Sequence, residues 1–269
     1  MTTVTSVDGT PIDFDAYGDG PAVILVGGAV QHRAIDQRTT EAARLLAADG
    51  YTAIDFDRRG RGRSGDTQPW TLQREVEDLA ALIAAAGGSA TVYTSSSGAT
   101  LGLQAALAGI GLTGLVLYEP PFFPGSGKAG QIEVIKSFLE RGDYDGAMRY
   151  NIVDIVGVPA QAVDGMAHSP MWPGMCSAAP TLVYDFSALD DVNTDSDWAA
   201  RWSEVAVPVS IYSGGNSSPG LAAAADRLAA ALPRAQRGIL PGQDHNPSAE
   251  ALAGAVTQHL SEIPPESSK

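Results

Sequence analysis

Short apolar runs alternate with helix-like segments along most of this 269-residue sequence. The runs are continuously apolar, as in parallel strands buried on both faces, and occupy residues 23–26, 52–56, 91–93, 115–118 and 209–212. Apolar residues recur with helical spacing in the segments 40–48, 72–86, 99–108 and 221–232. This alternation predicts an α/β protein with a mostly parallel sheet flanked by helices.

Two regions depart from the alternation. Residues 3–6 and 12–17 alternate polar and apolar side chains around Asp8-Gly9, which predicts an antiparallel hairpin at one sheet edge. No strand is expected from about 120 to 203, where helical spacing recurs at 132–141 and 144–156. That insertion holds every methionine except the initiator, with several aromatic residues. An adaptable apolar binding surface and a well-packed helical subdomain explain this composition equally well.

Composition excludes several functions and partners. A formal charge of −14 disfavours stable binding to nucleic acid or anionic membranes. Cys176 is the only cysteine, so no intramolecular disulfide is possible. The amino terminus lacks the pattern of an export signal and no apolar run reaches membrane-spanning length, so we expect a cytoplasmic protein. No metal-binding motif is present and no cofactor is expected.

The stretch VYTSSSGATLG, which begins at Val92, joins a predicted strand to a predicted helix. Counted back from Gly98, the Gly-x-Ser-x-Gly pattern of a nucleophile elbow places the nucleophile at Ser96. The pattern is imperfect because Thr94 stands where glycine is usual. The serines are also suited to cap the following helix, which is the structural alternative.

A nucleophilic serine needs donors for the oxyanion. The run 23–26 ends in Gly27-Gly28-Ala29, which is where an α/β-hydrolase places one backbone donor, so we predict the N–H groups of Ala29 and Ser97. The arginine-rich loop 55–65 lacks both a P-loop lysine and a Gly-x-Gly-x-x-Gly pattern, so phosphate binding fits it poorly.

His245 is the predicted general base. It follows a short strand and precedes the last helix, where the Ser, acid, His order places the base. We expect His259 at the surface of that helix, His168 in the insertion, and His32 near the pocket.

The acid is not where this fold usually carries it. The loop 213–220 contains no carboxylate. Glu119 directly follows the run 115–118, on the strand next to that of the nucleophile, and from there a carboxylate can reach the imidazole. Asn216 is the alternative group to orient the histidine.

Several motifs together resemble one family: GGAVQHRA, DRRGRGRSGD, SSSGATLGLQAA, LVLYEPPF, SPMW and LPGQDH. They resemble a group of bacterial α/β-hydrolases over essentially the whole chain, and SSGA with a glutamate after strand six is similar to zearalenone-type lactone hydrolases. The resemblance implies an eight-stranded α/β-hydrolase fold and a Ser96, Glu119, His245 triad. In the family pattern SPMW corresponds to a lid segment over the substrate. The sequence pattern itself divides the chain into a core of residues 1–121 and 204–263, a helical cap of 122–203 and a disordered tail of 264–269.

We therefore expect a serine hydrolase that cleaves a hydrophobic ester or lactone through an acyl-enzyme on Ser96. The small-molecule substrate is expected to contact Gly28, His32, Phe122, Met148, Met171, Trp172 and Tyr184. Two alternatives stay open: the same fold acting on a thioester, a carbon–carbon bond or a cyclisation, and a catalytically idle binding protein. A homodimer is a further possibility.

Overall fold

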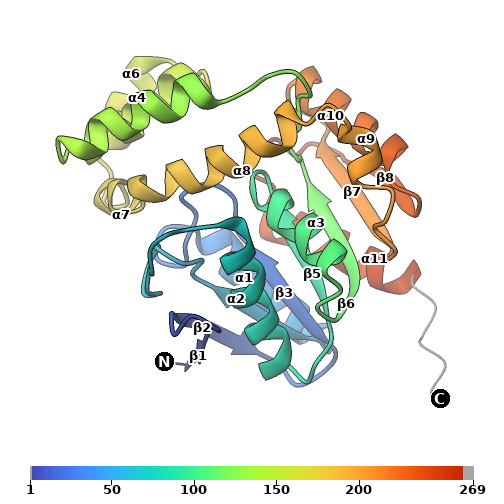
Figure 1. Cartoon of the computed structure of the whole chain (residues 1–269). Helices are drawn as coiled ribbons and strands as arrows, with labels where there is room; N and C mark the ends of the chain where they lie inside the picture. The colour runs from blue at the N-terminus through green and yellow to red at the C-terminus, as the bar shows by residue number, and fades with distance from the viewer. Residues whose placement is uncertain (1, 263–269) are drawn as a thin grey trace.

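The computed structural model describes residues 2–262, and within them one eight-stranded sheet forms the centre of the molecule (Figure 1). The strand order is β1-β2-β4-β3-β5-β6-β7-β8, and the strands from β3 onward run parallel. β2 is antiparallel to both β1 and β4, so the predicted edge hairpin is confirmed. The strands are β1 Thr2–Thr5, β2 Pro11–Tyr17, β3 Ala22–Val26, β4 Thr52–Phe56, β5 Ala90–Ser95, β6 Leu112–Tyr118, β7 Val209–Gly214 and β8 Ala235–Leu240.

Helices cover both faces of the sheet, which explains why the strand sequences are continuously apolar. In β3, Val23 and Leu25 pack into one hydrophobic cluster while Ile24 and Val26 pack into another. Helices α1 and α11 contribute to the first cluster, and α2, α3 and α10 to the second. The predicted α/β fold is thereby confirmed. The covering helices are α1 Gln37–Ala48, α2 Leu72–Ala85, α3 Gly98–Ala108, α10 Pro219–Ala231 and α11 Ala249–Glu262.

The region between β6 and β7 is helical. We call residues 122–203 the cap region. Its helix α8 lies between α4 and the core helix α3 (Figure 1). The elements of this region are α4 Ala129–Glu140, α5 Tyr144–Tyr150, a π-helix Asn151–Ile155, α6 Ala160–Ala167, α7 Trp172–Ser177, a 3-10 turn Ala179–Thr181, α8 Leu182–Thr194 and α9 Trp198–Arg201.

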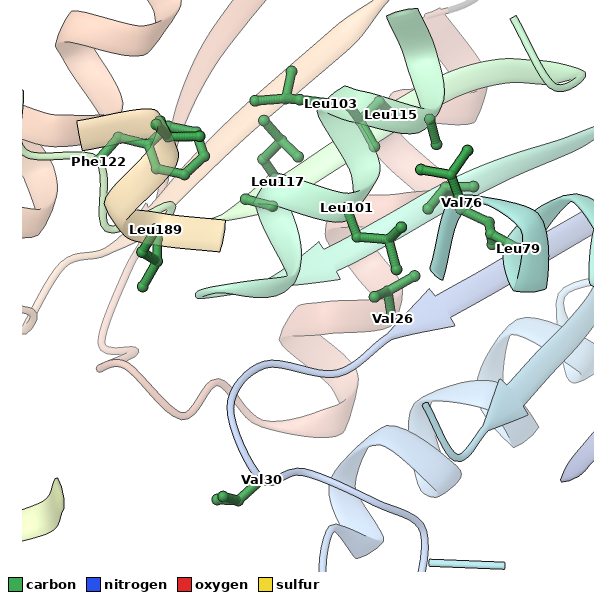
Figure 2. Packing of buried hydrophobic residues seen from close by; sticks show 14 of the residues in the cluster. Val26, Val30, Val76, Leu79, Leu101, Leu103, Leu115, Leu117, Phe122 and Leu189 are labelled. Atoms are coloured by element: carbon green, nitrogen blue, oxygen red, sulfur yellow. The ribbon is translucent and has the colours of Figure 1, made fainter. Parts of the chain in front are cut away.

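Helix α8 was not apparent from the sequence. Its buried residues lie on several sides of the helix and include Asp185 and Asn193, so no single apolar stripe marks it. One hydrophobic cluster runs from the sheet into the cap region. Figure 2 shows Leu117 in this cluster together with Phe122 and Leu189 of the cap region.

The predicted tail, residues 264–269, lies outside the described residues. Among the helices of residues 2–262, none combines the length and apolar character needed to cross a membrane.

Candidate active site

Ser96 lies at the sharp turn between β5 and α3. Its φ of 51° is in the left-handed region, which is uncommon for a residue with a side chain. The Ser96 N–H donates to the Tyr118 carbonyl at 2.9 Å, and this bond ties the turn to β6. A Cβ at Gly98 would lie 2.8 Å from the Gly27 carbonyl oxygen, so only glycine fits there. The local backbone is that of a nucleophile elbow.

Thr94 is accommodated by a second glycine in the next helix. Thr94 is fully buried, and a Cβ at Gly102 would lie 2.6 Å from its Cγ2 methyl. Because Gly102 has no side chain, there is room for the Thr94 methyl group. In the usual motif, glycine at position 94 would need no such room. The branched residue therefore fits beside the turn.

His245 connects Ser96 to Glu119. Its Nε2 lies 3.2 Å from Ser96 Oγ, and its Nδ1 lies 2.6 Å from Glu119 Oε2. His245 lies in the loop between β8 and α11, while the other two residues follow β5 and β6. Because these strands are parallel neighbours or near neighbours, their carboxyl ends bring the three side chains to one edge of the sheet.

Glu119 is fully buried and firmly held. Its φ is 50°, and its N–H donates to the Tyr212 carbonyl of β7 at 2.9 Å. Oε1 accepts the Gly214 N–H at 2.8 Å, which leaves Oε2 for His245. Burial raises the pKa of Glu119, but hydrogen bonds from His245 and the Gly214 N–H outweigh burial and lower the pKa below its usual value. An ionised Glu119 accepts a hydrogen bond from the Nδ1–H of His245, and this tautomer leaves the Nε2 lone pair facing Ser96.

Asn216, the alternative orienting residue, points elsewhere. Its side-chain amide donates to the Gly242 carbonyl at 3.1 Å, in an exposed contact within the loops after β7 and β8. The structure thus places Glu119, and not Asn216, against the imidazole.

The loop after β3 lies against the elbow. A Cβ at Gly28 would lie 3.0 Å from Ser96 Cβ. Within residues 2–262, neither the Ala29 nor the Ser97 N–H donates a hydrogen bond to another protein group. Both N–H groups are therefore free to donate to a ligand, which is one of the conditions for an oxyanion hole.

Three of the four arginines of the loop 55–65 are buried in ion pairs, and the fourth, Arg63, is exposed. Arg58 pairs with Glu75 and Asp185, Arg59 with Asp78 and Asp8, and Arg61 with Asp185. Each of the three arginines is at most 2% exposed. Carboxylates and backbone carbonyls of the protein therefore bind these three guanidiniums, which agrees with the poor sequence fit to phosphate binding.

The residues predicted to contact substrate occupy different environments. Gly28 lies beside Ser96, and Met171 is 49% exposed. Phe122, Met148 and Trp172 belong to the main hydrophobic cluster, with Phe122 stacked on Trp202 at a centroid distance of 6.0 Å. Their contact with substrate stays a prediction.

Two further predicted residues contact other parts of the protein. Tyr184 stacks on Trp70 and donates a hydrogen bond to Asp66. His32 is buried, and its Nε2 lies 3.3 Å from the Gly174 carbonyl of the cap region. A binding role for either side chain also stays a prediction.

The prediction for His259 was wrong. It is 2% exposed, and its Nδ1 lies 2.7 Å from Ser210 Oγ of β7. His259 lies on the face of α11 that packs against the sheet. The sequence did not indicate this, because a polar residue near the end of a helix is usually exposed. Burial lowers its pKa to about 4. His168, by contrast, is exposed on the cap region. Within residues 2–262, no group of three or more His, Cys, Asp or Glu side chains is arranged to hold a metal ion.

Comparisons of the sequence and the fold with known proteins identify the family to which the protein belongs. Residues 23–256 match the alpha/beta hydrolase family, and the chain belongs to that family. An alpha/beta hydrolase from Sphaerobacter thermophilus has 40% sequence identity and a TM-score of 0.86, over 96% of this chain and 100% of that one. The family assignment supports a hydrolase.

Two esterases share the fold at lower identity. One, from Thermogutta terrifontis, has 21% identity and a TM-score of 0.71, over 97% of this chain and 98% of that one. The other, from Exiguobacterium antarcticum, has 16% identity and a TM-score of 0.69, over 97% of both chains.

Proposed function

We propose that this protein is a serine hydrolase that cleaves a carboxylic ester or lactone of a hydrophobic small molecule. The observation that carries the proposal is the hydrogen-bonded series from Ser96 Oγ through His245 to Glu119, with distances of 3.2 and 2.6 Å. The series ends on a buried carboxylate and begins at a strained turn, as a nucleophile, base and orienting acid require.

In the first half-reaction, His245 Nε2 takes the proton of Ser96 Oγ as the oxygen attacks the carbonyl carbon. The carbonyl oxygen becomes an oxyanion, which the Ala29 and Ser97 N–H groups stabilise. Glu119 stabilises the imidazolium that forms. The imidazolium then gives its proton to the leaving alkoxide oxygen, and the carbon–oxygen bond breaks to leave an acyl group on Ser96.

In the second half-reaction, His245 takes a proton from water, and the hydroxide oxygen attacks the acyl carbon. The proton returns to Ser96 Oγ as the acyl bond breaks, which releases the carboxylic acid. Water is the only co-reactant. In a lactone, the alcohol and the acid remain parts of one opened product.

The proposed substrate class rests on the cap region. Its apolar, methionine- and aromatic-rich composition favours an apolar substrate, and we propose that residues 122–203 close over the site and exclude water. The resemblance to zearalenone-type lactone hydrolases supports a lactone as one member of the class.

A serine-directed fluorophosphonate tests the nucleophile. The wild type should gain one covalent label on Ser96, detected by peptide mass spectrometry, and Ser96→Ala should gain none. Absence of labelling, or labelling of another residue, would contradict the proposal and favour an idle binding protein.

Short p-nitrophenyl esters test the acid. Glu119→Gln should lower kcat by about 10⁴-fold, because an amide favours the wrong imidazole tautomer. Asn216→Ala, an exposed control in the neighbouring loop, should keep kcat close to that of the wild type. The reverse result would assign the orienting role to Asn216. A panel of esters and lactones of graded size would then define the substrate.

A further inference from the structure

A buried carboxylate in the cap region contacts one side of the candidate oxyanion hole directly and the other side through an arginine. Asp185 of α8 is 1% exposed. Its Oδ1 accepts a hydrogen bond from the Ser97 hydroxyl at 2.9 Å, and its Oδ2 accepts a hydrogen bond from Arg61 Nη2 at 2.6 Å. Burial raises its pKa, yet the Arg61 and Arg58 guanidiniums hold the pKa of Asp185 below its usual value. Asp185 is therefore a carboxylate in the folded protein.

Arg61 connects this carboxylate to the loop after β3. Arg61 Nη1 donates to the Gly28 carbonyl at 2.5 Å. The Gly28 carbonyl and the Ala29 N–H belong to the same planar peptide group, and in a trans peptide they point in opposite directions. A guanidinium on the carbonyl side therefore fixes the direction of the N–H. It also polarises the peptide, which makes the N–H a stronger donor.

Arg58 supports the same loop one residue earlier. Its Nη1 donates to the Gly27 carbonyl at 3.2 Å and to Asp185 Oδ1 at 2.9 Å, and Glu75 binds the other side of its guanidinium. The two arginines and two carboxylates balance in charge. The cluster can therefore hold the loop without placing an uncompensated negative charge beside a developing oxyanion.

We infer that Asp185 is a positioning residue through which cap helix α8 orients both donors of the oxyanion hole. It holds Ser97 directly and holds the Gly28–Ala29 peptide through Arg61. This inference rests on the proposed function. It assigns Asp185, Arg61 and Arg58 to transition-state stabilisation, while Ser96, His245 and Glu119 carry the proton transfers.

The test compares two buried ion pairs. In Asp185→Asn the shape is kept and the charge is lost. Asp78→Asn is the matched control, because the Asp78–Arg59 ion pair is as deeply buried as the Asp185–Arg61 pair. Arg59 contacts Asp78, Asp8 and the Arg74 carbonyl, so this pair does not hold the loop after β3. For each variant, kcat and KM are measured with an ester that the wild type hydrolyses. The inhibition constant of a trifluoromethyl ketone, whose adduct on serine places an oxyanion in the hole, and the melting temperature are also measured.

Asp185→Asn should lower kcat by about 10-fold or more and weaken the ketone by a similar factor, with KM nearly unchanged, because the affected interaction exists only in the transition state. Asp78→Asn should lower the melting temperature but leave kcat within about 2-fold of the wild type. Ser97→Ala keeps the backbone donor and removes only the Asp185 contact, so it should lower kcat in the same direction. If Asp185→Asn does not fold, Ser97→Ala and Arg61→Lys decide the question.

Two results would overturn the inference while leaving the proposed function intact: an active wild type with unchanged kcat in folded Asp185→Asn and Ser97→Ala, or equal losses of kcat in Asp185→Asn and Asp78→Asn. A wild type that neither hydrolyses esters nor reacts with the fluorophosphonate would overturn both.

Discussion

Backbone strain at single residues concentrates around the candidate site. In residues 2–262, the non-glycine residues with positive φ are Val30, Ser96 and Glu119. Ser96 and Glu119 are two members of the proposed triad, and Val30 follows Ala29, which carries one of the proposed oxyanion donors. Such conformations cost of order 1–3 kcal/mol each and persist only where the surroundings enforce them. Their gathering at one place is independent support for a functional site there.

His259 gives a residue-scale prediction about pH. Its pKa is about 4 in the folded protein and near 6.5 when unfolded, so between these values the unfolded state binds the proton more tightly. The stability that a neutral His259 permits is thus present above pH 6.5 and is lost as the pH falls toward 4. Between pH 7 and 5, this group should remove about 2 kcal/mol from the free energy of unfolding.

Urea unfolding at several pH values measures the effect. His259→Gln stays neutral and can still bond Ser210, so its free energy of unfolding should fall less between pH 7 and 5 than that of the wild type. His168→Gln, on the exposed face of the cap region, is the control and should behave like the wild type. Equal slopes in the wild type and His259→Gln would refute the prediction.

At the scale of elements, the fit between β5 and α3 determines whether the elbow forms. The two elements meet where the Thr94 methyl group packs against Gly102. A side-chain methyl group of Leu115, in β6, packs against the same glycine. The unusual residue of the elbow and the glycine of the helix are thus one packing solution. A larger side chain at position 94 faces a smaller residue at position 102, as in a well-packed protein core where large and small residues face each other.

Gly102→Ala should reduce the free energy of unfolding by about 1–3 kcal/mol through overpacking, although alanine is the better helix former by about 1 kcal/mol. In a Thr94→Ala background the same substitution should cost clearly less, because the methyl it meets is gone. A double-mutant cycle by urea unfolding measures the coupling. An equal cost of Gly102→Ala in both backgrounds would show that the two residues are independent.

For the whole molecule, the sheet and the cap region are joined by one hydrophobic cluster and by the buried pairs of Asp185. Tryptophan fluorescence reports on this junction. Three of the four tryptophans, Trp172, Trp198 and Trp202, belong to the cap region, and the fourth, Trp70 of the core, stacks on Tyr184 of the cap region with a centroid distance of 4.9 Å. Far-ultraviolet circular dichroism, in contrast, reports on the helices of the whole chain.

We therefore predict that the cap region and the core unfold together. Tryptophan fluorescence and circular dichroism should give the same urea midpoint, as one cooperative transition requires. A fluorescence midpoint at clearly lower urea would show that the cap region opens separately. Ser96→Ala, which leaves the junction intact, should retain the coincidence.

Local pattern was enough to predict the parallel sheet, the edge hairpin and the helices that cover the core, because burial on one or two faces produces a periodic sequence. Chain order and turn chemistry were enough to select Ser96, Glu119 and His245 as candidates that the fold then places together. The helix α8, the burial of His259 and the pairing of Thr94 with Gly102 depend on packing between distant segments.

The same holds for the partners of Asp185, which lie 88 and more residues away in the chain. A charged residue in a helical segment has the same local pattern whether it faces solvent or two buried arginines. Only the folded chain decides between these cases, because the free energy that makes its burial acceptable comes from contacts that no local window of the sequence contains.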